Sequence, residues 1–155
     1  MKKLSCFLCG LIITFCISSN VYSQELTTEQ RGKITSEIST TFQKSIQAAE
    51  NLDAKLLAGC VDDSLQAGFI VGGIFFASFK EVMADFEKKA VGCKSQDLNV
   101  VNQRITVLGE DRALLVATGD YSLYLEDGRT LTGRFAWTIV YSKVKGEWKI
   151  IHSHM

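Results

Sequence analysis

The C-terminal part of the chain alternates apolar and polar residues with a period of two, a pattern that only β-strands accommodate. Four such runs cover residues 98–108, 112–125, 130–144 and 147–154. The breaks between them are short: Gly109-Glu110-Asp111, Asp127-Gly128 and Lys145-Gly146. Connections of this length join neighbouring strands as hairpins, so we expect an antiparallel meander.

The segment before the meander has helical periodicity. Thr27 and the glutamine three residues later form a capping box, and apolar residues then recur every three or four positions, which predicts one amphipathic helix over residues 28–50. A cap at Asn51 or Asp53 predicts a second, short helix over residues 54–60.

A small hairpin and a third helix follow. Gly72-Gly73 lies between two apolar triplets and supplies the positive φ angles of a two-residue turn. Ser78 and Glu81 form another capping box, and an apolar stripe continues to Ala90 before Gly92 ends the helix. Three helices followed by consecutive strands, without β-α-β alternation, predict an α+β domain whose helices cover one face of a curved sheet.

The N-terminus resembles an export signal. Lys2-Lys3 precedes the uncharged apolar stretch 4–17, and small residues lead up to Ser23. We therefore expect cleavage after Ser23, a mature domain of residues 24–155, and a periplasmic or secreted protein without a membrane segment. A retained anchor or a lipidated Cys16 are the alternatives.

Composition excludes several function classes. The mature chain keeps 15 Lys and Arg residues against 17 Asp and Glu, a net charge of −2, and has no basic cluster of the kind that nucleic acids require. The mature chain has no phosphate loop, no dinucleotide fingerprint and no Cys-x-x-Cys pair, so we expect no cofactor and no metal. Cys60 and Cys93 either form a disulfide or stay as two buried thiols.

Turn geometry sorts the strand residues into two faces. If Asp127-Gly128 and Lys145-Gly146 are both two-residue loops, Asp120 lies opposite Phe135 and Trp137 lies opposite His154. The face toward the helices then carries Asp120, Tyr124, Phe135, Trp137, Ile139, Tyr141, Trp148, Ile150, His152 and His154. The other face is smoother, which suits contact with a second copy of the chain, and carries Ala113, Ala117, Gly119, Ala136, Thr138, Val140, Ile151 and Ser153. A slip of one residue in either turn would exchange these sets for that strand.

This arrangement places candidate functional residues beneath the helices. Asp120 on an aromatic face has the desolvation that raises a carboxyl pKa toward a general base, and His152 is a second acid/base candidate. The alternatives are a solvated strand-end Asp and structural histidines. A ligand pocket would be lined by Phe69, Phe86, Phe135, Trp137, Tyr141 and His154.

The order of elements and the ending Gly146-Glu147-Trp148-Lys149-Ile150-Ile151-His152-Ser153-His154 resemble the nuclear transport factor 2-like (cystatin-like) superfamily. SnoaL-like proteins and the calcium/calmodulin-dependent kinase association domain are its most similar branches. A weaker resemblance to the family comes from Asn51-Leu52-Asp53 and Cys60-Val61-Asp62-Asp63 in the region of the second helix. The resemblance implies a cone-shaped fold with a pocket between sheet and helices, and often dimerisation through the sheet.

Two functions are compatible with this resemblance, because the fold does not determine the activity. The favoured hypothesis is an exported, homodimeric module of the SnoaL-like type that either binds a small apolar or partly polar molecule in an aromatic-lined pocket or serves in assembly. The alternative is a small cofactor-independent isomerase or hydrolase that uses Asp120 or His152.

Overall fold

The computed structural model describes residues 25–155. The expected signal segment 1–23 and Cys16 lie outside the described residues. Among the residues that are described, no helix is both long and apolar enough to cross a bilayer.

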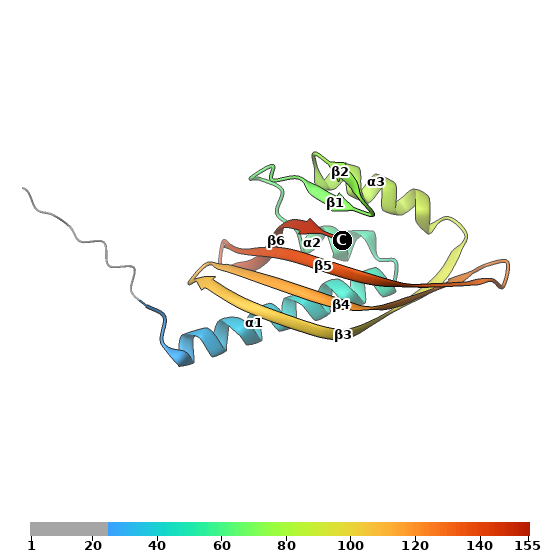
Figure 1. Ribbon diagram of the computed structural model, residues 1–155. Coiled ribbons are helices and arrows are strands. Elements are labelled where there is room, and N and C mark those ends of the chain that lie inside the picture. The colour runs from blue at the N-terminus through green and yellow to red at the C-terminus, as the bar shows by residue number, and fades with distance from the viewer. Residues whose placement is uncertain (1–24) are drawn as a thin grey trace, which may run out of the picture.

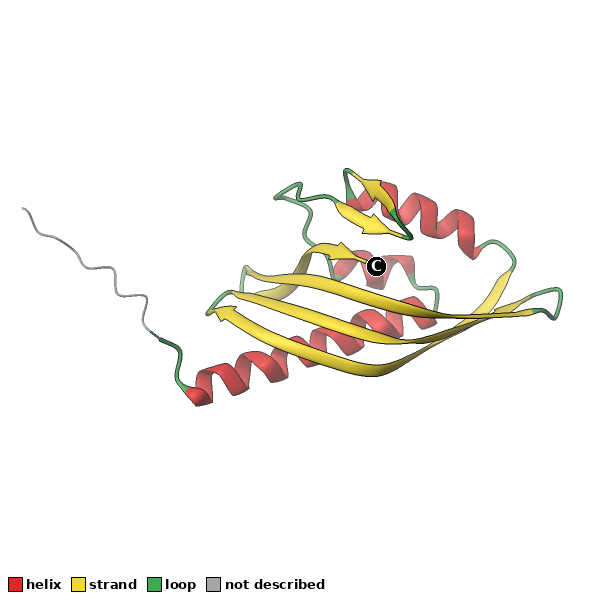
Figure 2. Ribbon diagram, viewed as in Figure 1, coloured by secondary structure: helices red, strands yellow, loops and turns green. Residues whose placement is uncertain are grey.

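The α+β prediction is confirmed (Figures 1 and 2). The helices are α1 (Thr28–Glu50), α2 (Ala54–Gly59) and α3 (Phe79–Ala90). The strands are β1 (Phe69–Val71), β2 (Ile74–Phe76), β3 (Cys93–Gly109), β4 (Arg112–Leu125), β5 (Thr130–Val144) and β6 (Glu147–His154). They form one sheet in the order β2-β1-β6-β5-β4-β3, which adds the small hairpin to the meander through a parallel pairing of β1 with β6.

Both predicted capping boxes start their helices. The Thr27 hydroxyl accepts the backbone N–H of Gln30 at 3.1 Å, while the Gln30 side chain accepts the N–H of Thr27 at 2.8 Å. Ser78 and Glu81 make the equivalent exchange at α3. These contacts satisfy backbone donors that the first helical turn leaves free.

Helix α1 runs along the sheet and supplies one side of the core (Figure 1). Its buried apolar stripe is Ile34, Ile38, Phe42 and Ile46, at the four-residue spacing of one helix face. This stripe belongs to the same core cluster as Leu115, Ile139 and Tyr141 of the sheet. The α1 side chains also reach the edge strand, because Glu50 accepts the N–H of Leu98 at 3.0 Å.

The turn at Asp127-Gly128 differs from the prediction. The N–H of Leu125 donates to the carbonyl of Arg129 at 2.9 Å, so the loop contains three residues and not two. Every pair between β4 and β5 is therefore shifted by one: Asp120 lies opposite Arg134, and Phe135 lies opposite Gly119. The predicted faces of β4 are wrong as a result, since the odd-numbered residues of this strand face the helices.

The turn at Lys145-Gly146 is tight, as predicted, but β6 contains a bulge. Tyr141 pairs with Ile150, and the next pair is Val140 with His152, which leaves Ile151 as an extra residue. Beyond Ile151 the faces of β6 are exchanged. Ser153 turns toward the interior, and His152 and His154 turn away from it.

Candidate functional site

A cavity of about 540 Å³ lies between the sheet and the helices. Its walls come from α1, α2, α3 and all strands of the meander, and they are mostly aliphatic and aromatic. A volume of this size is in the range of small-molecule sites, which are typically apolar with a few polar groups. The cavity predicted between sheet and helices is therefore present in the structure.

The sheet wall of the cavity is an aromatic stack. Phe135 and Trp137, two residues apart on β5, stack with ring centroids 4.1 Å apart and planes inclined by 24°. Phe42 of α1 meets Trp137 edge-on at 6.2 Å. Both stacked rings are only half-buried, so they present aromatic surface to the cavity.

Helix α3 supplies the opposing wall. Phe79, Val82 and Phe86 follow one another along the same side of this helix and line the cavity. Phe86, Phe135 and Trp137 thus occupy the places expected for ligand-binding residues, and their role in binding stays a prediction.

Two glycines let aromatic rings lie flat against the sheet. A Cβ atom at Gly133 would come within 2.5 Å of the Tyr121 hydroxyl oxygen, and one at Gly119 would lie 2.5 Å from the Phe135 ring. Each glycine is the direct cross-strand partner of the ring that covers it. These pairs shape the cavity because the rings fill space that a side chain would take.

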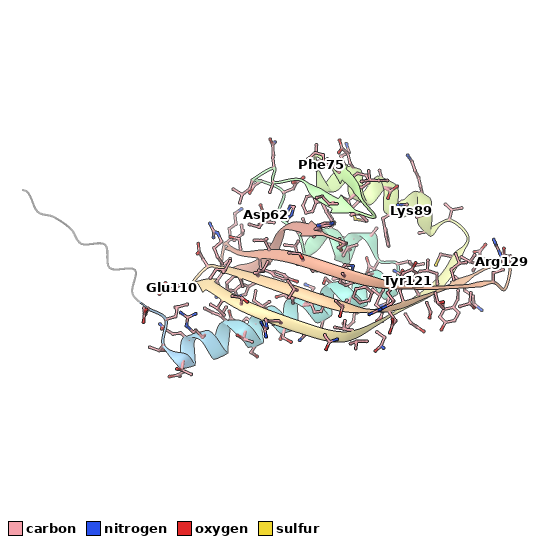
Figure 3. All side chains as sticks on the ribbon, viewed as in Figure 1. Asp62, Phe75, Lys89, Glu110, Tyr121 and Arg129 are labelled. Carbon is pink, nitrogen blue, oxygen red and sulfur yellow. The ribbon has the colours of Figure 1, made fainter. Side chains whose placement is uncertain are left out.

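The charged groups at the cavity are paired. Lys89 and Asp85 on α3 form an ion pair with a nitrogen–oxygen distance of 2.7 Å, and 61% of the Lys89 side chain is exposed. Arg134, 87% exposed, lies 3.9 Å from Asp120. In Figure 3, Lys89 belongs to α3 and Tyr121 belongs to the sheet. The Lys89 head group therefore lies in solvent at the rim, whereas the Arg134 side chain lies with Asp120 on the outer face of the sheet.

The expected position of Asp120 beside the aromatic rings is wrong. The three-residue turn places it on the outer face of the sheet, opposite Arg134, where its carboxylate is more than half exposed. The desolvation that would tune it as a general base is missing there.

Both histidines also lie outside the cavity. The bulge at Ile151 directs His152 away, and its Nδ1 atom is 2.8 Å from the carbonyl oxygen of Gly68. His154 lines a shallow depression on the outer face, next to Thr138 and Val116. In place of the histidines, Ser153 lines the cavity.

Phe69 and Tyr141 are core residues and do not line the cavity. Phe69 is fully buried and packs edge-on against Phe79, with ring centroids 5.2 Å apart. Tyr141 is fully buried on the helix-facing side of β5, and its hydroxyl has no hydrogen-bond partner among residues 25–155. Burial raises the pKa of the Tyr141 phenol; the nearby Cys60 thiol adds to this effect and Ser45 partly offsets it.

Cys60 and Cys93 are free thiols, so the disulfide alternative is wrong. Cys60 is buried behind the cavity, and desolvation raises the pKa of its thiol. Within residues 25–155, no group of three or more potential metal ligands comes together.

Sequence reasoning missed Ser153, Tyr121 and Ser45. The adjacent pair Ile150-Ile151 interrupts the alternation and could have indicated the bulge. The positions of Gly119 and Gly133 could have indicated the register, because only the shifted pairing sets each glycine opposite an aromatic ring.

Several solved structures share this fold. A nuclear transport factor 2-like superfamily protein from Salmonella enterica serovar Typhimurium superimposes with a TM-score of 0.72 at 16% identity, covering 80% of this chain and 90% of that one. A hexachlorocyclohexane dehydrochlorinase gives a TM-score of 0.68 at 14% identity, with 83% and 87% covered. At these identities the similarity establishes the fold alone.

A protein from Xanthomonas campestris named for the calcium/calmodulin dependent protein kinase II association domain gives a TM-score of 0.66 at 20% identity, covering 76% of this chain and 83% of that one. No curated protein matches the chain. The family model of that same association domain matches residues 35–155, which is most of the chain. The protein therefore belongs to the calcium/calmodulin dependent protein kinase II association domain family, and it shares the fold of the nuclear transport factor 2-like protein described above.

Proposed function

We propose that this protein is a binding module that holds a small apolar molecule in the cavity between the sheet and α3. The observation that carries the proposal is the half-buried stack of Phe135 and Trp137 facing a cavity of about 540 Å³. Large aromatic side chains gain most from burial, and a ligand in the cavity would complete the burial of both rings.

Binding is favoured over catalysis by the positions of the titratable groups. Asp120 and His152, the acid/base candidates from the sequence, lie outside the cavity. Asp85 reaches the cavity, but its carboxylate is paired with Lys89 at the rim. A general acid or base has to come within hydrogen-bond reach of the proton that it transfers, and neither of the two sequence candidates meets this requirement in the cavity.

N-phenyl-1-naphthylamine, an uncharged dye that brightens in apolar surroundings, tests the proposal. We expect saturable binding to the purified protein, and weakening by about tenfold in Phe135→Ala and in Phe86→Ala, because each variant removes an apolar wall worth about 1.5–3 kcal/mol when buried. Phe75→Ala is the matched control, since Phe75 is 67% exposed and does not line the cavity. Absence of saturable binding, or an equal loss in Phe75→Ala, would contradict the proposal.

We also propose that two copies of the chain associate through the outer face of the sheet. No helix of residues 25–155 belongs to the depression on this face, which is lined by strand residues. Its central cross-strand row contains Val116 and Thr138, with Arg104 and His154 at its two ends. Ala136 lies in the adjoining row, opposite Thr118. Such a face buries apolar surface when a second sheet packs on it.

Light scattering tests this association. We expect a mass twice that of the monomer for the parent protein and a monomer for Val116→Lys, because the new ammonium lies in a row with Arg104 and His154. Gln43→Lys, at an exposed position of α1, is the control and should stay dimeric. A monomeric parent protein at micromolar concentration would refute the interface.

For the location in the cell, we propose export to the periplasm or beyond. Lys2-Lys3 and the apolar stretch 4–17 support it. N-terminal sequencing of the protein from a Gram-negative host should begin at Gln24, whereas a chain that keeps Met1 and stays in the cytoplasm would disprove export.

A further inference from the structure

One serine that lines the cavity has a hydroxyl free to bind a ligand. Ser153 is 2% exposed, lines the cavity, and makes no side-chain hydrogen bond with any of residues 25–155. Its neighbours on the adjacent strands, Phe69 and Ile139, are buried residues whose apolar side chains cannot form a hydrogen bond with it. A ligand in the cavity can therefore form a hydrogen bond with a hydroxyl that no side chain of residues 25–155 already occupies.

Ser45, the other buried serine of the cavity, differs in this respect. Its hydroxyl donates to the carbonyl oxygen of Phe42 at 2.7 Å, within α1. The donor of Ser45 is therefore occupied, while the donor and the acceptor of Ser153 are both free for a ligand.

The walls suit a flat, ring-shaped molecule. The stack of Phe135 and Trp137 presents ring surface on the sheet side, and Phe86 faces the cavity from α3. Aromatic groups prefer offset-stacked or edge-to-face contacts with other rings, so a planar ligand between these walls gains more than a flexible chain of equal area.

The charges of the site disfavour an ionised ligand. Lys89 is solvated at the rim and already paired with Asp85, and the Arg134 side chain lies with Asp120 on the outer face of the sheet. An anion beside Ser153 would lose its hydration without gaining a cation, and the faces of the aromatic rings are themselves electronegative.

We propose that the cavity selects an uncharged ring compound with one hydroxyl or carbonyl group, and that Ser153 is the hydrogen-bond partner of that group. This inference rests on the proposed function, because it names the ligand class of the same cavity.

Three probes with one ring system test the selection: naphthalene, 2-naphthol and 2-naphthoate, each measured by displacement of N-phenyl-1-naphthylamine from the purified protein near neutral pH. We expect 2-naphthol to bind about three- to tenfold more tightly than naphthalene, as one hydrogen bond provides. We expect 2-naphthoate to bind at least about tenfold more weakly than 2-naphthol.

Variants identify the hydrogen-bond partner. Ser153→Ala should remove the advantage of 2-naphthol over naphthalene, and Ser45→Ala should keep that advantage. If naphthalene binds but 2-naphthol gains nothing, if Ser153→Ala preserves the gain, or if 2-naphthoate binds as tightly as 2-naphthol, the selection is refuted and the binding function stands. If neither the dye nor naphthalene binds, the binding function fails and this inference fails with it.

Discussion

At the scale of single residues, the hydroxyl of Tyr141 is a buried polar atom without a hydrogen bond of ordinary geometry. It lies near Ser45 and Cys60, and it makes no hydrogen bond of ordinary geometry with residues 25–155. The surrounding apolar contacts hold the ring in place, while the oxygen loses its hydration.

Tyr141→Phe should therefore stabilise the protein by about 1 kcal/mol, because it removes an unsatisfied polar atom and keeps the packing of the ring. Urea denaturation measures the change. Tyr124→Phe is the matched control: it removes an exposed hydrogen bond to Asp97 and should change the stability by less than about 0.5 kcal/mol. A loss of stability in Tyr141→Phe would show that the hydroxyl has a partner.

The residues also explain which parts of the site the sequence could predict. The indole of Trp137 and the ring of Phe135 face inward as expected, because β5 alternates regularly. Asp120 was misplaced because Asp-Gly suits a two-residue loop and also the end of a three-residue loop. The prediction for His152 and His154 was wrong because one extra residue in β6 moves every later side chain to the opposite face of the sheet.

At the scale of elements, the glycines of β4 and β5 hold the sheet wall of the cavity in its shape. The Tyr121 ring blocks a Cβ atom at Gly133, whereas the backbone oxygen of Asn99 and the Phe135 ring both block one at Gly119. A new Cβ atom can displace a side chain by changing its rotamer, but it can displace a backbone oxygen only by moving the strand that carries it.

Gly133→Ala should cost about 1–3 kcal/mol through displacement of the Tyr121 ring, and Gly119→Ala should cost more. Thermal or urea unfolding of both variants measures which substitution costs more stability. The control is Gly32→Ala on α1, where nothing lies within 4 Å of the new Cβ and the helix should gain about 0.5–1 kcal/mol. The reverse order for the two strand glycines would contradict the packing described above.

A second element-scale contact joins α1 to the hairpin of β5 and β6. The Trp148 indole donates to Glu37 at 2.7 Å, and the Lys143 ammonium lies 3.1 Å from the same carboxylate oxygen. These hydrogen bonds, with that from Trp148 as the larger cause, lower the pKa of Glu37 below its ordinary value of 4.5.

A depressed carboxyl pKa contributes stability above the unfolded-state value and loses it as the pH falls through the folded-state value. The contribution of Glu37 should thus be complete at pH 7 and decline below about pH 4.5. Glu37→Gln should cost about 1 kcal/mol at pH 7 and progressively less toward pH 3, as measured by urea denaturation at each pH. A cost that is the same at both pH values would show that the charge of Glu37 contributes nothing.

At the scale of the whole molecule, elements were easier to predict than their assembly. Capping boxes, apolar stripes and Gly turns lie within a few residues of one another, so the sequence indicates all three helices and the hairpin directly. The strand β3 begins at Cys93 and not near residue 98, because its first residues are polar and are held by α1 through Gln96 and Glu50. The parallel pairing of β1 with β6 depends on contacts between segments more than 80 residues apart, which no local pattern records.

The central claim is that the cavity beside Trp137 is the ligand site, and the two tryptophans of the chain allow it to be tested in one spectrum. A ¹⁵N-labelled sample should give two indole N–H signals, one from Trp137 at the cavity and one from Trp148, which is bonded to Glu37 away from it. On addition of N-phenyl-1-naphthylamine, the account predicts that the Trp137 signal shifts with saturation and the Trp148 signal stays in place. A saturable shift of Trp148 alone, or bound dye with neither signal moving, would contradict it.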